Sequence, residues 1–142
     1  MLINTETNTR VWEHDFKAGY PNTSFPELLT DAVVTDFGHA VLVYPAQPLV
    51  SRGQNVIDNG HAHIDGKWQV QWSVIEKTAD ELAGIATGIR ADRNARLSAC
   101  DWTQVADAPV DVAAWATYRQ ALRDVPAQAG FPLDVAWPTQ SE

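Results

Sequence analysis

His61-Ala-His63 is the part of the sequence that comes closest to a metal-binding pattern. Alternate residues of a strand share one face, so an H-x-H pair can present two imidazoles to a metal, here with Asp58 and Asp65 nearby. A metal-dependent hydrolase would need a further ligand, and the sequence places neither of the other two histidines close by. We therefore interpret His61 and His63 as structural or surface residues, with the metal site as the alternative.

The chain has no other pattern typical of catalysis. Its single cysteine, Cys100, rules out a disulfide within the chain. Arginines precede Cys100 and Asp101 follows it, so the predicted role is a small apolar side chain at a helix end. The sequence has no G-x-S-x-G elbow, Walker motif or dinucleotide fingerprint, and its carboxylates form no recognisable acid–base pair. These features predict a protein that is not an enzyme and needs no metal or cofactor.

The composition is that of a folded, acidic protein. The 142 residues are 45% hydrophobic and 20% charged, and the formal net charge is −8. This negative charge disfavours nucleic acid and anionic membranes as partners. The sequence begins without the features of a signal peptide and has no apolar run of about 20 residues, so we expect a soluble protein made in a cytoplasm.

Residues 1–77 have the sequence patterns of strands and turns. Asp65-Gly66 lies between alternating residues and predicts a tight β-hairpin over 54–76. Residues 39–45 read HAVLVYP, an apolar run that indicates a buried strand. A short strand is expected around Thr9–Glu13, and one or two helical turns are expected within PELLTDAVV.

One face of the predicted hairpin is apolar. Trp68, Val70 and Trp72 alternate with polar residues and lie opposite His61 and His63. We hypothesise that this face binds a partner if the chain cannot cover it alone. That partner is either a protein or a glycan, because tryptophans with polar neighbours could stack on sugars.

Residues 78–142 have sequence patterns typical of helices. Thr78 and Glu81 form a capping-box pattern that opens a helix running to about Ala99. Its apolar stripe is narrow and would suit a small oligomeric helix bundle. We propose the stripe as a second partner-binding surface, formed by Leu82, Ile85 and Ile89.

Arginines recur every three residues on this helix, at Arg90, Arg93 and Arg96. Such a strip is typical of a solvated helix face, and binding to an acidic partner is the alternative.

A second helix is expected from near Asp111 to Asp124, because Pro126 cannot continue it. Its arginines, at 119 and 123, lie near the C-terminal end, where they favour the helix dipole. The tail after it should pack in an extended form against the helices. The predicted fold is α+β, with a β-rich region over 1–77 and a helical hairpin with an extended tail over 78–142.

Five motifs in the last third of the chain occur in a fixed order. They are DWTQ at 101–104, D-x-P at 107–109, W-x-x-Y-R-Q-x-L-R-D at 115–124, Q-x-G-F-P at 128–132 and W-P at 137–138. Together with the arginine-containing helix before them, they make the segment from about residue 90 to 138 resemble the phage tail assembly chaperone family. The residues that carry the resemblance include Asp101, Trp102, Thr103, Gln104, Trp115, Tyr118, Arg119, Leu122, Phe131, Pro132 and Trp137.

The resemblance implies a role in building phage tails. Similar small proteins help tail fibres fold, trimerise or attach, in the host cytoplasm, and some related proteins stay on the fibre in the virion. It therefore implies a tail-fibre partner, with a homotrimer or three copies per fibre. The alternative is a fibre-tip module that recognises a host glycan.

Trp102 has two predicted roles within this module. As a structural clasp it would insert between the two helices, against Trp115 and Tyr118, with Asp101 capping a turn. As a partner anchor it would contact the fibre directly.

Overall fold

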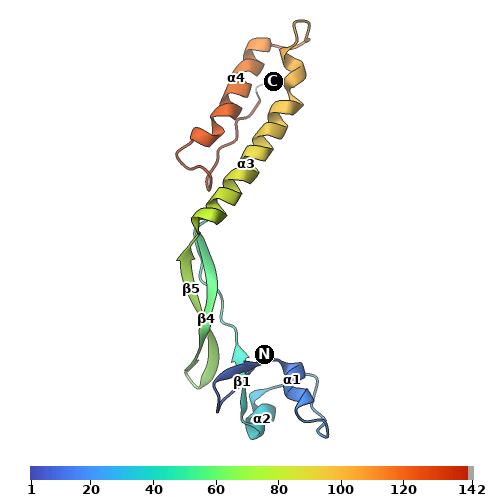
Figure 1. Ribbon diagram of the computed structural model, residues 1–142, viewed down its shortest axis with the longest axis vertical. Coiled ribbons are helices and arrows are strands. Elements are labelled where there is room, and N and C mark those ends of the chain that lie inside the picture. The colour runs from blue at the N-terminus through green and yellow to red at the C-terminus, as the bar shows by residue number, and fades with distance from the viewer. Residues whose placement is uncertain (141–142) are drawn as a thin grey trace. The chain divides into compact units, whose positions relative to one another are not determined.

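The computed structural model describes residues 1–140 and divides into two compact units. The N-terminal unit comprises residues 1–50 and 56–75, and the C-terminal unit comprises 51–55 and the chain from 76 onward. Strands dominate the first unit and helices the second, which confirms the α+β class (Figure 1).

The N-terminal unit is built on a five-stranded sheet with the order β2-β1-β3-β5-β4. β1 runs antiparallel to both β2 and β3, whereas β3 runs parallel to β5. The strands are β1 (Leu2–Asn4), β2 (Thr9–Val11), β3 (His39–Val43), β4 (Gln54–Ile64) and β5 (Lys67–Glu76).

Three short helical elements accompany the sheet. They are α1 (Glu13–Ala18), α2 (Asp31–Val34) and the 3-10 helix η1 (Thr35–Phe37). Leu2, Phe16, Leu29 and Val34 form a buried cluster with the helices. Phe16 lies at its centre, within about 6 Å of four other aromatic rings. The expected strand at 39–45 and the short helix after Pro26 are both confirmed.

A second cluster contains the apolar face of the hairpin. Val70 is 1% exposed and packs with Ile3 and Leu42, and Trp68 and Trp72 lie half-buried against them. The indole N–H of Trp72 donates to the Pro45 carbonyl oxygen at 2.9 Å. The chain thus covers much of the face that the sequence suggested for a partner.

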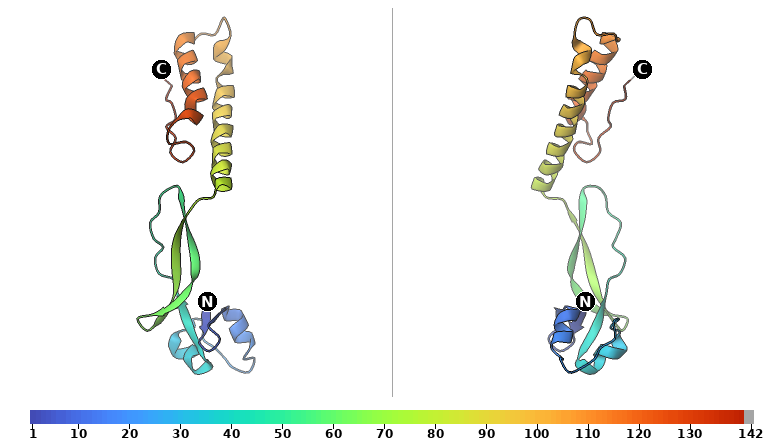
Figure 2. Two further views of the ribbon diagram at one scale, coloured as in Figure 1. Left: turned by 60° about the vertical axis from the view of Figure 1, so that its left-hand side comes forward. Right: turned by 90° about the vertical axis from the view of Figure 1, so that its right-hand side faces the viewer.

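The predicted hairpin turn is confirmed. Asp65 and Gly66 connect β4 to β5 with φ angles of 50° and 75°. Positive φ at both central residues is the type I′ arrangement, which matches the twist of the two strands (Figure 2).

The C-terminal unit is a helical hairpin with a returning tail. Its elements are α3 (Ala79–Ala99), η2 (Asp101–Gln104), α4 (Val112–Asp124) and η3 (Val125–Ala127). The Thr78–Glu81 capping box is present, and the Asp111 carboxylate caps α4 by accepting from two backbone N–H groups. Both predicted helices are confirmed at both ends.

The α3 arginine strip packs against the tail more than the solvated-face prediction implied. The Arg90 guanidinium lies 5.1 Å from the Phe131 ring centre, and the Arg96 guanidinium lies 4.3 Å from that of Trp137. Such cation–π contacts fix the tail to the helix. The paired hydrogen bonds of the Gln128 amide with the Ala136 backbone hold the tail in a loop.

Gly66→Ala should destabilise the N-terminal unit by about 1–2 kcal/mol. A Cβ there would meet nothing within 4 Å, so the cost comes from the positive φ alone. Gly66→Asn is the matched control and should cost less, because Asn tolerates this conformation. Urea denaturation measures both, and equal losses would contradict the assigned turn.

Candidate functional site

Arg119 joins the two helices of the C-terminal hairpin. It lies on α4, is 9% exposed, and reaches the end of α3. Its Nη1 donates to the Leu97 carbonyl oxygen at 2.8 Å, and its Nη2 donates to the Asp101 carboxylate at 2.7 Å. The hydrogen bond to Asp101 is the largest influence raising the pKa of Arg119 above its usual value. We expected Arg119 near the helix C-terminus and among the family motif residues, and its inward position was not predicted.

Cys100 and Thr103 complete the connection around Arg119. Cys100 is buried, and its Sγ lies 3.1 Å from Arg119 Nη1. Thr103 is fully buried, and its hydroxyl donates to the Cys100 carbonyl oxygen at 2.7 Å. These short-range bonds close η2 on itself, so the DWTQ motif has one defined shape.

Trp102 does not insert between the helices. It is 51% exposed, although its ring centre lies 6.1 Å from that of Trp115, a neighbour that the clasp prediction named. Thr103 occupies the buried position next to it. Asp101 makes no capping bond to the turn, because its carboxylate is held by Arg119. Both are corrections to the predicted clasp.

The outer part of the connection is therefore apolar and exposed. Trp102, Val105 and Val112 are 51%, 52% and 43% exposed, and we call these three residues the tip surface. Asp107 and Asp111, both exposed, lie in the same connection. Of the other motif residues, Leu122 is fully buried and belongs to the hairpin core.

The remaining predicted residues are partly buried. In the motif these are Trp115, Tyr118, Phe131, Pro132 and Trp137, while Gln104 is exposed. The α3 stripe of Leu82, Ile85 and Ile89 is also half-buried.

In the N-terminal unit, His61 helps to link the two edges of the sheet. Arg10 on edge strand β2 forms an ion pair with Asp58 on edge strand β4 and donates to the Gly60 carbonyl oxygen at 2.7 Å. Arg10 Nε also donates to His61 Nδ1 at 3.3 Å, and His61 Nε2 lies 3.1 Å from the Asn8 side-chain oxygen. We call this group the edge bridge. The edge bridge was not predicted from sequence, because Arg10 and its partners on β4 lie about 50 residues apart.

His61 and His63 both pack against Trp68, with ring centres 5.7 Å and 5.3 Å from that of the indole. His63 is exposed and lies outside the edge bridge. Within residues 1–140, no group of three His, Cys, Asp or Glu side chains is placed to hold a metal ion. The two histidines thus share an aromatic neighbour, and only His61 belongs to the edge bridge.

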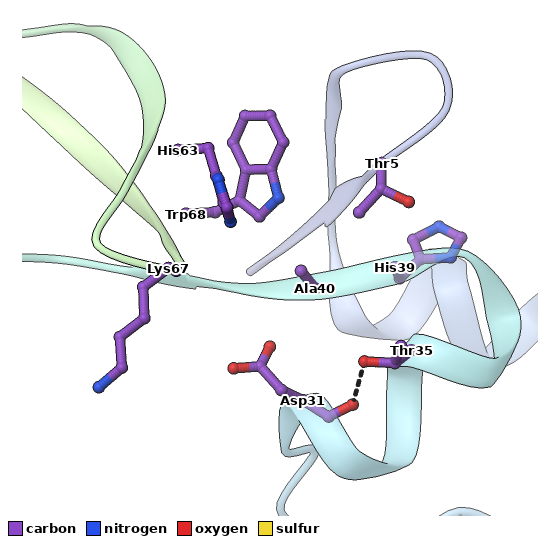
Figure 3. Close-up of a pocket in the computed structure, with 9 residues that line it drawn as sticks. Thr5, Asp31, Thr35, His39, Ala40, His63, Lys67 and Trp68 are labelled. Carbon is purple, nitrogen blue, oxygen red and sulfur yellow. Dashed lines mark hydrogen bonds between the residues drawn. The ribbon is translucent and has the colours of Figure 1, made fainter.

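His63 and Trp68 line a pocket of about 280 Å³ over the start of β3. Figure 3 shows Ala40 on the strand in the middle of the site. His63 and Trp68 lie at one end, Thr5 and His39 lie at the other end, and Asp31 lies on the opposite side of the strand from Trp68. The pocket lies wholly within the N-terminal unit.

The C-terminal unit is a helical hairpin whose connection exposes Trp102, Val105 and Val112. Residues 86–142 match the protein-family profile described as phage tail assembly chaperone protein, which confirms the family resemblance for this segment. The match supports a role in phage tail assembly. Neither the curated proteins nor the solved structures contain a significant match. None of the helices in residues 1–140 is long and apolar enough to cross a membrane.

Arg119→Met should destabilise the C-terminal unit by about 2 kcal/mol, because it removes charged hydrogen bonds but keeps an apolar stem. Arg123→Met on the exposed side of the same helix is the control and should stay within about 0.5 kcal/mol of wild type. Urea denaturation followed by circular dichroism measures both. Similar losses in the two variants would show that Arg119 does not join the helices.

The edge bridge also predicts a pH dependence. The Arg10 guanidinium, with help from the Gly60 N–H, lowers the pKa of Asp58 from 3.8 to about 2. Because the folded-state pKa is depressed, this contribution to stability is present above about pH 4 and is lost as pH falls toward 2.

Asp58→Asn should therefore weaken the N-terminal unit at neutral pH and make its loss of stability between pH 4 and 2 shallower. Asp36→Asn, at an exposed position, is the control. Thermal unfolding across this pH range tests the prediction, and identical profiles for wild type and Asp58→Asn would refute it.

Proposed function

We propose that this protein binds a phage tail-fibre protein through the tip surface during tail assembly. The observation that supports this most directly is the 51% exposure of Trp102 within the segment that matches the family. Large aromatic side chains at the centre of an interface supply much of its binding energy. Trp102 would serve as such an anchor, with Val105 and Val112 exposed in the same connection.

The hydrogen bonding of the connection favours the same role. The Thr103 hydroxyl donates to the Cys100 carbonyl oxygen, and Arg119 donates to the side chain of Asp101, the residue before Trp102. A side chain already held in place loses less conformational entropy on binding than one on a flexible loop. This explains how the DWTQ motif can serve both predicted purposes, with Thr103 on the structural side and Trp102 on the binding side.

The other two surfaces suggested by the sequence are less available. Val70 is in the core, with Trp68 and Trp72 packed against it. The α3 stripe of Leu82, Ile85 and Ile89 is half-buried. The tip surface is therefore the better candidate for contact with the fibre.

The proposed role is binding without catalysis, in the host cytoplasm where tails assemble. Fibres of this kind are trimers, so three copies of this chain per fibre are expected. Persistence on the fibre would make it a component of the virion, and release would make it an assembly chaperone. Glycan recognition is the second candidate function, and the pocket beside Trp68 is the observation that favours it.

Co-expression with a tail-fibre protein of the same phage tests the proposal. The fibre carries the purification tag, and light scattering gives the size of the product. Trp102→Ala should weaken the interaction by about 2 kcal/mol or more. Trp12→Ala is the matched control, because Trp12 is 59% exposed but lies in the N-terminal unit.

A complex of fixed stoichiometry would identify a fibre component, and a trimeric fibre that needs this protein but purifies without it would identify a chaperone. A fibre that folds, trimerises and purifies identically without this protein would refute the proposed function. Equal effects of the two tryptophan substitutions would refute the tip surface.

A further inference from the structure

The pocket in the N-terminal unit lies where β3 has no partner from β5. The two strands pair at Leu42 with Trp68 and at Val43 with Gln69, so the start of β3, which includes Ala40, is left unpaired on that side. The Asp31 carboxylate from α2 accepts the Val41 N–H at 2.6 Å. The small side chain of Ala40 leaves the space above this stretch open, and the pocket occupies it.

The walls of the pocket combine an aromatic side with polar groups. Trp68 and His63 form the aromatic side (Figure 3). Across Ala40, Thr5 contributes a hydroxyl, and His39 contributes an imidazole whose Nδ1 lies 2.7 Å from the Phe37 carbonyl oxygen. Because a carbonyl only accepts, Nδ1 carries the proton, and Nε2 of the neutral ring is left as an acceptor.

The charges in the lining favour a neutral ligand. Asp31 opposes anions and Lys67 opposes cations, and both line the same pocket. A volume of about 280 Å³ is at the small end of the ~300–1,000 Å³ typical of ligand pockets. A single sugar ring fits these requirements, since it is uncharged, has an apolar C–H face for the Trp68 ring, and has hydroxyls that both donate and accept.

We propose that this pocket is a saccharide-binding site. Trp68 and His63 pack against the sugar ring, and the Asp31 carboxylate accepts from its hydroxyls. The site lies within residues 5–68, outside the segment that matches the family. It is therefore independent of the tip surface, and either proposal can fail without the other.

The test is a titration of the full-length, isotope-labelled chain with glucose, galactose, N-acetylglucosamine and rhamnose, each followed by NMR. At least one sugar should produce saturable shifts in the Ala40 and Lys67 amides and the Trp68 indole. Asp31→Asn should weaken binding roughly tenfold or more, because the amide keeps an acceptor oxygen for Val41 but removes the charge. Asp36→Asn, a nearby exposed residue outside the pocket lining, should leave the affinity unchanged.

His63→Ala is a second variant, and it should fold normally because His63 is exposed. It should weaken sugar binding, whereas His14→Ala, at another exposed histidine, is the control and should not. The same titration with a polysaccharide built from the sugar that binds then identifies the natural ligand. Tighter binding of the polysaccharide indicates a surface glycan, and weaker binding indicates the free sugar. Absence of saturable shifts for every sugar at a Kd of roughly 10 mM or tighter would overturn the proposal. Binding that Asp31→Asn and His63→Ala leave unchanged would overturn it as well.

Discussion

The shape of the helical hairpin depends on the buried guanidinium of Arg119. A charged group that is nine-tenths buried is costly unless it is hydrogen-bonded. Leu97 near the end of α3 and Asp101 in η2 supply oxygens for the two terminal nitrogens of Arg119, while Nε has no hydrogen-bond partner among the described residues. These oxygens are correctly placed only when α3 and α4 meet in this register. The interaction thus selects one arrangement of the connection. The exposure of Trp102 follows, because Thr103 and the Arg119 contacts occupy the interior beside it.

A second arginine has a comparable role in the N-terminal unit. Arg10 joins edge strands that are distant in sequence, and His61 becomes one of its acceptors. One of the two imidazoles that the sequence offered for a metal is therefore part of the edge bridge. His63, two residues further along, lines a pocket with Trp68. Both rings of the H-x-H motif pack against Trp68, and only His61 reaches Arg10.

Local features of this fold were predictable from sequence because their causes are local. The capping box at Thr78 and the Asp65–Gly66 turn each depend on residues within four positions, and both are present. The inward position of Arg119 was not predictable in this way, because its acceptors lie about 20 residues earlier. The same limit applies to the edge bridge and to the pocket. Trp102 was placed in the interior because of its size, but the smaller Thr103 can bond within the turn and so occupies that position.

Hydrogen–deuterium exchange on the complex with the tail-fibre protein tests the central claim most directly, since it maps the contact without altering the chain. The account predicts that fibre binding slows exchange in the connection from 101 to 112, while amides of the sheet in the N-terminal unit exchange as in the free protein. Protection confined to β4 and β5, with unchanged exchange around Trp102, would contradict the assignment of the helical tip as the fibre-binding surface.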